Sequence, residues 1–300
     1  MPPILRFLLY RIISIPITLL IITMSLYGFV MLTPPQVRVT LYYPSGLNLD
    51  RMTSEQISRM NASLIKKYHL DDPYPIQYSI WAVNLLKGDW GWSPVHHEKV
   101  LPALLRRSPV TAEIAIYSIL FFIPLGLISG VRAGSKKNSP IDTRFRFGAF
   151  LAISMPPFVM ALVMLSIFYV GLHWFPPQRL SIPSTLFVNS DQFQKFTGFM
   201  TIDGFLNHRS DISIEAFKHL VLPVLTISLC YWGIIGRVTR ASVIEEQLKE
   251  HVIAARARGI SERSLVWKHI FRNAMTPALT SSVLSAAALF TSVFIVEIIF

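Results

Sequence analysis

The sequence predicts an all-α protein that crosses a lipid bilayer several times. Of its 300 residues, 52% are hydrophobic and only 15% are charged, whereas a typical soluble domain has about 25% charged residues. The mean hydropathy is +0.47. A soluble core of this size does not need so much apolar sequence, so the excess indicates contact with lipid.

Five apolar stretches are long enough for membrane spans, each of which needs about 20 such residues. They are 12–37, 114–131, 147–172, 219–236 and 273–296. The first follows Arg6 and Arg11, as a signal peptide would, but a signal core has only about 7 to 15 residues. We therefore interpret 12–37 as a retained span.

Prolines and glycines interrupt the last three stretches, as membrane helices tolerate when neighbouring helices satisfy the freed backbone groups. Such residues mark either kinks along a translocation path or close packing, and the sequence alone favours packing. The residues concerned are Pro156, Pro157, Pro223, Gly233 and Gly236.

The basic residues predict the orientation of these spans. Segment 132–146 has five lysines and arginines, and segment 237–272 has eight. Short basic loops face the cytoplasm, so both segments and the N-terminus are expected there, with 38–107 outside. The net charge of +11 is sufficiently explained by this topology, and we expect no nucleic-acid partner.

The first outer segment has helical patterns of its own. Thr53 is expected to cap a helix over 53–68, and a second helix is expected over 78–86, ended by Gly88. The nearby Trp81, Trp90 and Trp92 suit the membrane interface, with ligand stacking as the alternative. The second outer loop, 175–217, is expected to be irregular with short helices at most.

Polar residues elsewhere give little sign of a catalytic or metal centre. Cys230 is the single cysteine and lies in an apolar run, so we expect a core residue. The run 96–98, His-His-Glu, lacks the helical spacing of metal ligands. Glu113 and Glu297 lie near span ends and are interpreted as packing residues rather than proton sites.

The cytoplasmic segment after the fourth span is predicted to be helix, turn, helix. The fourth span continues without a helix breaker to Leu248, and a short Ala-rich helix from Glu250 must stop at Gly259. Ser261 is expected to cap the next helix. A thin helix with flanking arginines suits a groove on an acidic partner, whereas the simpler interpretation is a basic loop that only sets topology.

The same segment resembles the EAA loop of binding-protein-dependent ABC transporter permeases. The matching residues run from Glu250 to Gly259 and continue at Ile270, 272–274 and Pro277. The amino acids at these positions resemble those of the dipeptide, oligopeptide and nickel permease branch. Segments 68–91, 101–113, 124–126 and 154–158 resemble other parts of that branch in the same order.

The sequence departs from the family pattern at three places. Ile253 stands where the acidic residue of the motif is expected, and Thr33-Pro34-Pro35-Gln36 replaces a common Pro-Gly-Asp-Pro run. The outer loop 187–213 is longer than the pattern suggests. These departures concern the identity of the cargo more than the transport class.

The resemblance implies a type I ABC importer permease fold in the inner membrane. It divides the chain into 1–110, with the first span and an outer helical segment, and 111–300, the permease core with a coupling loop at 237–272. Five spans are visible in the sequence, and a sixth is expected after Phe300. The residues expected to couple to an ATPase are Glu250, Val252, Ala254, Ala255, Arg256, Ala257, Arg258, Gly259, Ile270 and Pro277.

The resemblance also implies a subunit that is not itself an enzyme and binds no cofactor. ATP would be bound by a separate cytoplasmic P-loop ATPase, and this sequence has no Gly-x-x-x-x-Gly-Lys-Ser/Thr motif. The other implied partners are a second permease subunit, identical or not, and an extracytoplasmic substrate-binding protein. Peptides are the expected cargo. The alternatives are nickel or another small solute, and a secondary transporter as a different class.

Overall fold

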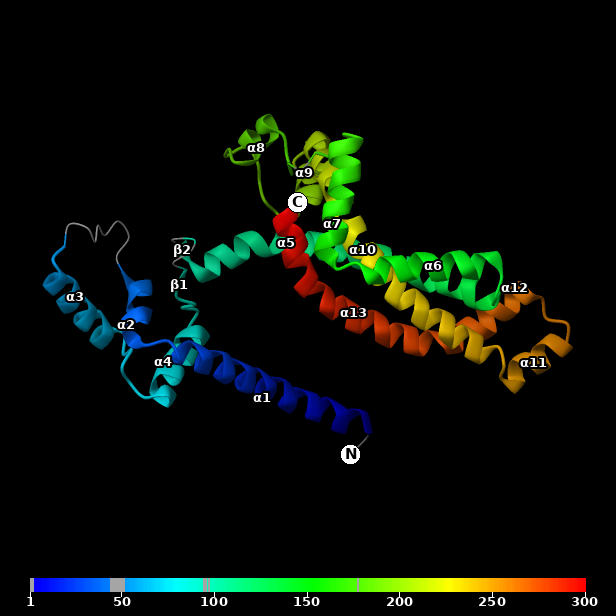
Figure 1. Cartoon of the computed structure of the whole chain (residues 1–300), viewed down its shortest axis with the longest axis horizontal. Helices are drawn as coiled ribbons and strands as arrows, with labels where there is room; N and C mark the ends of the chain where they lie inside the picture. Colours follow the sequence, from blue (N-terminus) through cyan, green and yellow to red (C-terminus); the bar gives the residue numbers. More distant parts are fainter. Residues whose placement is uncertain (1–2, 44–51, 94–95, 97, 177) are drawn as a thin grey trace. The chain divides into compact units, whose positions relative to one another are not determined.

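The computed structural model describes residues 3–43, 52–93, 96, 98–176 and 178–300 (Figure 1). The chain forms two compact units, Met1–Arg106 and Arg107–Phe300. Nearly all regular structure in the described residues is helical, in agreement with the all-α prediction. His97, the middle residue of the run at 96–98, lies outside the described residues. Within the described residues, no group of three or more side chains could hold a metal ion.

Four helical segments of the described chain are long and apolar enough to cross a membrane. They are Ile4–Met31, Val100–Ser135, Ser210–Glu246 and Glu262–Ile299, and a bent pair of helices adds a fifth span if it counts as one. Each of the five predicted stretches overlaps one of these helices or the bent pair. The first helix, α1 (Pro3–Met31), begins and ends earlier than 12–37, because Pro34 and Pro35 stop it and open α2 (Pro35–Arg38).

The third predicted span is not a single straight helix. It consists of α6 (Pro140–Ser154) and α7 (Pro157–Leu165), extended by a π-helix over Ser166–Gly171, with a bend of 103° between the two halves. Met155 at the break has φ −97° and ψ 125°. A residue before proline is driven from the helical to the extended region. Of the two interpretations of these prolines, a kink or close packing, the preference for packing is therefore wrong at Pro156, which breaks the helix.

The first unit holds α1, α2, the 3₁₀ helix η1 (Val39–Tyr42), α3 (Ser54–Lys67) and α4 (Tyr74–Leu86). A two-stranded antiparallel ribbon follows, formed by β1 (Trp92–Ser93) and β2 (Glu98–Lys99). Thr53 caps α3 as predicted, in a capping box with Gln56. Gly88 has φ +85° just after α4, which confirms its role as a helix stop. Helix α4 begins before residue 78 because Pro73 and Pro75 fit a first turn.

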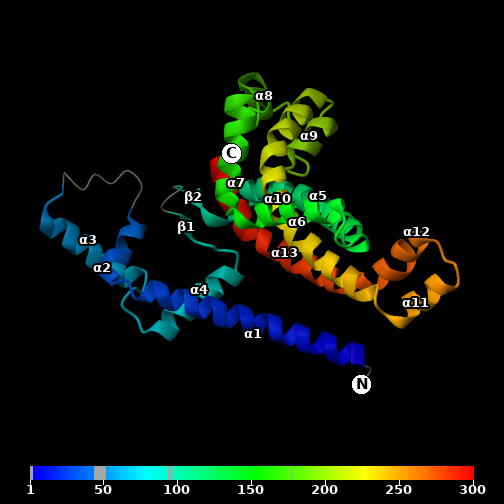
Figure 2. The same ribbon diagram turned by 45° about the vertical axis from the view of Figure 1, so that its right-hand side comes forward.

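The second unit is built around α10 (Ser210–Glu246), which packs against α13 (Phe271–Ile299), α6 and α7. Figures 1 and 2 both show α10 and α13 side by side. Their shared core includes Ile227, Ile235, Leu289 and Val293, and Cys230 is buried in it as expected. In the predicted loop 175–217, the described residues before α10 form the short helices α8 (Ile182–Val188) and α9 (Met200–Leu206), as predicted, whereas residues 210–217 already belong to α10.

Helix α5 (Val100–Ser135) approaches α10 along a stripe of three glycines spaced four residues apart. A Cβ on Gly126 would lie 2.9 Å from Ile235 Cβ, and one on Gly134 would lie 2.9 Å from the Arg240 carbonyl oxygen. At Gly130 the distance to the Gly236 carbonyl oxygen would be 2.6 Å. Small residues at this spacing let membrane helices touch backbone to backbone. The stripe therefore fixes the C-terminal half of α10 against α5.

Candidate functional site

The segment after α10 folds as the predicted helix, turn and helix. Helix α11 (Glu250–Ala257) is followed by Gly259, whose φ of +77° lies in the region that favours glycine. Helix α12 (Glu262–Ser264) continues through a π-helix over Leu265–Ile270 into α13. Figures 1 and 2 show α11 and α12 at one end of the α10–α13 pair. Ser261 occupies the N-cap position, but its side chain makes no capping hydrogen bond, so that prediction is wrong.

The buried side chain of Val252 anchors helix α11 to the long helices. Val252 is fully buried in an apolar cluster with residues from four other elements. The buried partners are Val131 of α5, Val243 of α10, Leu265 and Ile270 of the following π-helix, and Ala274 of α13. A displacement of α11 therefore changes the packing of α5, α10 and α13 together, because buried side chains leave few voids to absorb it.

A buried carboxylate forms a second anchor at the end of α10. The side chain of Glu246 is 5% exposed and contacts Lys249 at 2.5 Å and His251 at 3.2 Å. Asn273 Nδ2 of α13 donates a hydrogen bond to it at 2.8 Å. The hydrogen bond from Lys249 to Glu246 raises the pKa of the lysine. These contacts tie both ends of the segment, the last turn of α10 and the first turns of α13, to the start of α11.

An ion pair braces the turn around Gly259. Arg256 Nε donates to Glu262 Oε1 at 2.6 Å, and this hydrogen bond raises the pKa of Arg256. The sequence suggested that Arg256 pairs with an acidic partner protein, and it did not indicate this pair within the chain. Arg258, in contrast, lies exposed in the turn.

The C-terminal end of α10 is also held to α6 and α5. Arg240 Nη2 donates to Asp142 Oδ2 at 2.8 Å, and the Asn138 backbone N–H donates to the same oxygen at 2.9 Å. Gln247 Nε2 donates to the Gly134 carbonyl at 2.8 Å. No pattern in the sequence predicted these contacts. The signal that could have found them was Asp142, the single acidic residue in the basic segment 132–146.

The ten residues expected to couple to an ATPase fall into two groups in the structure. Val252 and Ile270 are fully buried, and Ala255 is half-buried against the same cluster. The others are exposed: Glu250, Ala254, Arg256, Ala257, Arg258, Gly259 and Pro277. Ile253 is exposed as well, at 56%. Helix α11 thus has a buried side at Val252 and a free side with Ile253, Ala254 and Ala257, which we call the α11 surface.

The residues of this site all lie within the part of the chain that matches a known protein family. Residues 122–300 match the model of the family described as "Binding-protein-dependent transport system inner membrane component". The "Di/tripeptide transport system permease protein DppB" of Pseudomonas aeruginosa is 31% identical over 243 residues, which are 81% of this chain and 70% of that protein. The "Dipeptide transport system permease protein DppB" of Bacillus subtilis is 26% identical over 296 residues, 98% and 81% of the two chains.

These matches confirm the resemblance that segment 250–277 indicated. The family match extends over more than half of the chain and includes α10, α11 and α13. The chain belongs to the family of binding-protein-dependent transport system inner membrane components.

Proposed function

We propose that this chain is the permease subunit of an ATP-driven importer of di- or oligopeptides. Its relatives from Pseudomonas aeruginosa and Bacillus subtilis are named di/tripeptide and dipeptide permeases. The observation that carries the proposed mechanism is the two-sided character of α11. Val252 is buried in a cluster shared with three long helices, while the α11 surface is free to meet a partner.

Helix α11 acts in this proposal as the lever between ATP hydrolysis and the spans. The small Ala254 and Ala257 allow a partner backbone to approach closely, and Ile253 offers an apolar side chain to a pocket on it. When the partner moves, Val252 carries the displacement into α10 and α13. The glycine stripe then moves α5 with α10, because their backbones are in direct contact.

The partners follow from this role. A separate cytoplasmic P-loop ATPase binds and hydrolyses ATP, so the chain itself is not an enzyme and needs no cofactor. A second permease subunit completes the pathway, and an extracytoplasmic binding protein delivers the peptide. In this proposal the chain is a multi-pass protein of the inner membrane. Its N-terminus and segment 237–272 face the cytoplasm. Residues 1–110 and 111–300 form two separate functional parts.

The test uses cells that lack this chain but retain its partner subunits. Uptake of a radiolabelled tripeptide is measured after complementation with the unchanged chain, with Ile253→Asp, or with Ile141→Asp as the control. Ile141 lies in the first turn of α6, and its exposed fraction of 47% is similar to the 56% of Ile253. We expect Ile253→Asp to lower uptake at least tenfold at equal membrane content, because a desolvated carboxylate weakens the ATPase contact, and Ile141→Asp to retain uptake.

Three results would contradict the proposal. Uptake that survives ATP depletion but stops with a proton ionophore would indicate a secondary transporter. Uptake of nickel without uptake of any peptide would overturn the cargo. Equal uptake by Ile253→Asp and the unchanged chain, with the ATPase still bound to both, would overturn the role of the α11 surface.

A further inference from the structure

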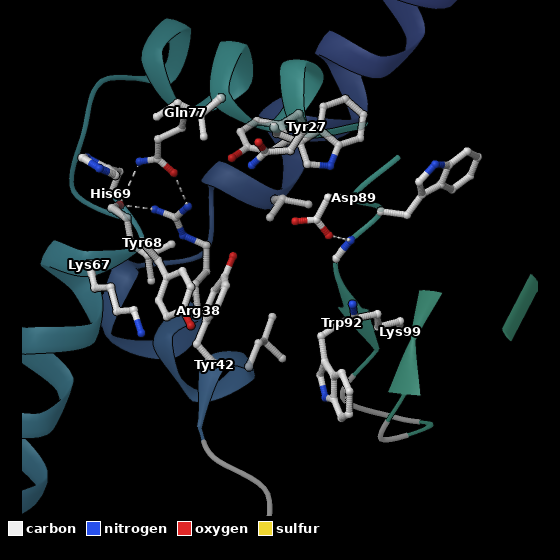
Figure 3. Close-up of a pocket in the computed structure, with 18 residues that line it drawn as sticks. Tyr27, Arg38, Tyr42, Lys67, Tyr68, His69, Gln77, Asp89, Trp92 and Lys99 are labelled. Carbon is white, nitrogen blue, oxygen red and sulfur yellow. Dashed lines mark hydrogen bonds between the residues drawn. The ribbon is translucent and has the colours of Figure 1, made fainter. Parts of the chain in front are cut away.

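The first unit contains a cavity of about 530 Å³ that the transport mechanism does not use (Figure 3). Its walls come from the last turns of α1, from α2 and η1, from the end of α3 and from α4 and the β-ribbon. Figure 3 shows Arg38, Tyr42 and Lys67 on one side of it and Asp89, Trp92 and Lys99 on the other. The cavity therefore joins residues that are up to 72 positions apart, from Tyr27 to Lys99.

A buried guanidinium with only neutral partners lies in its wall. Arg38 is 6% exposed, and its Nη atoms donate to Gln77 Oε1 at 2.9 Å, the Leu70 carbonyl at 2.8 Å and Met31 Sδ at 3.1 Å. Its Nε is buried without a hydrogen-bond partner, and no carboxylate of the described residues lies within 4.0 Å. A buried charge is costly unless an opposite charge compensates it.

The remaining lining increases the positive charge. Lys67 and Lys99 also line the cavity, whereas Asp89 is the acidic residue among its lining side chains. Asp89 Oδ1 already accepts a hydrogen bond from the Gly91 backbone at 3.1 Å. Burial raises the pKa of Tyr42, so its phenol stays neutral beside Arg38. Three cations against one carboxylate favour an anionic ligand.

The other walls place the cavity at the level of lipid head groups. Tyr27 and Val30 belong to the last turns of α1, a helix apolar enough to span a membrane. The rings of Tyr27 and Trp81 lie 5.6 Å apart, which joins α1 to α4. Tyrosine and tryptophan are typical of the zone between lipid chains and water.

Helix α4 itself has the character of an interfacial helix. Ile76, Ile80 and Val83 are exposed, and their spacing puts them on one side of the helix. An apolar side of this kind lies against acyl chains. A small soluble anion would account for the cations but not for this apolar stripe beside them.

We propose that this cavity binds the head group of an anionic phospholipid, with its phosphate near Arg38, Lys67 and Lys99 and its acyl chains along α1 and α4. The lipid offsets the charge of Arg38 and links α1 to α3 and α4. The inference does not depend on the cargo or on ATP coupling, so its failure leaves the proposed function untouched.

The test titrates the purified full chain in a non-ionic detergent with dioleoylphosphatidylglycerol and follows its thermal unfolding. A ligand that binds the folded state raises the unfolding temperature, and above its dissociation constant the increase follows the logarithm of the free ligand concentration. The same titration with dioleoylphosphatidylcholine, inorganic phosphate and trialanine distinguishes the chemical classes. We expect an increase of this logarithmic form with phosphatidylglycerol only.

The double variant Lys67→Gln, Lys99→Gln tests the position. Both lysine side chains are exposed, so we expect the double variant to fold. It therefore tests the cavity even if the more direct variant Arg38→Gln, which removes a buried charge, fails to fold. We expect the dissociation constant fitted to the titration to rise about tenfold or more, since each basic residue near an anionic lipid contributes roughly a factor of five. The control Lys66→Gln, Lys87→Gln removes the same charge from outside the lining and should leave the titration within twofold.

Several outcomes overturn the proposal. Equal stabilisation by phosphatidylcholine would show that charge is irrelevant, and an equal loss in both double variants would remove the cavity as the site. An increase in unfolding temperature with trialanine or with inorganic phosphate in place of the lipid would assign the cavity to a soluble ligand.

Discussion

The substitution Gly130→Ala adds a single methyl group where α5 and α10 touch. That Cβ would lie 2.6 Å from the Gly236 carbonyl oxygen and 2.7 Å from Thr239 Cβ. Neither atom can rotate away, because one is backbone and the other is attached directly to it. Carbon atoms in contact sit about 3.5–4.0 Å apart, so the two helices must separate by about 1 Å locally.

The expected cost follows from this separation. Overpacking a well-packed core costs about 1–3 kcal/mol, and the higher helix propensity of alanine returns up to about 1 kcal/mol. The net loss is about 1–2 kcal/mol, which lowers the unfolding temperature by about 3–6 °C for a unit of this size. The separation also weakens the contact of Val131 with Val243 and Val252, so peptide uptake should fall more than the stability alone predicts.

The measurement is thermal unfolding of the purified chain in detergent, together with uptake in complemented cells. Gly148→Ala is the matched control, because it also lies inside a helix but its Cβ would be 3.4 Å from Trp232 Cη2, an ordinary contact. We expect the control to be neutral or slightly stabilising. If Gly130→Ala unfolds at the same temperature as Gly148→Ala, the close contact of α5 with α10 is refuted.

Three further predictions concern the coupling segment. Asp142→Asn leaves Arg240 without its carboxylate partner and should lower the free energy of unfolding by about 3 kcal/mol. Thermal unfolding measures this loss. A loss below about 0.5 kcal/mol would mean that the ion pair is absent in the membrane. Val252→Ala removes buried volume and should lower the free energy of unfolding by about 2 kcal/mol. Because α11 loses its anchor, peptide-stimulated ATP hydrolysis by the assembled transporter should fall as well. Unchanged stimulation would contradict the proposed role of α11 as a lever. Gly259→Ala forces a Cβ into φ +77° and should cost about 1 kcal/mol with a large loss of uptake. The control Gly88→Ala imposes a similar strain at φ +85°, also with no atom within 4 Å of the new Cβ, and should leave uptake intact; equal uptake by the two variants would contradict a special role of the turn.

Local patterns in the sequence predicted the features that local physics determines. The apolar stretches, the Thr53 cap and the stop at Gly259 each depend on a few neighbouring residues, and the structure has them. The break before Pro156 had a local signal too, the effect of proline on Met155. Its apolar surroundings nevertheless favoured one continuous span.

Long-range pairs were beyond such patterns. Asp142 and Arg240 are 98 residues apart, and the sequence gives no register between their helices. The glycines at 126, 130 and 134 indicate a contact stripe by their spacing, but the choice of α10 as the partner depends on tertiary packing. The burial of Arg38 was equally hidden, because a lone arginine after a span is usually a solvated charge.

The break between α6 and α7 also has a consequence for backbone hydrogen bonding in a medium without water. A helix start leaves its first N–H groups without intrahelical acceptors, and each unsatisfied group in lipid costs several kcal/mol. Pro156 and Pro157 have no N–H to satisfy, and the N–H groups of Val159 and Met160 donate to the Pro156 carbonyl at 3.0 and 3.1 Å. The two prolines thus create the bend and at the same time remove donors that the bend would expose. A chain with alanine at both positions would have to find acceptors in the hydrocarbon for two more amides, or straighten.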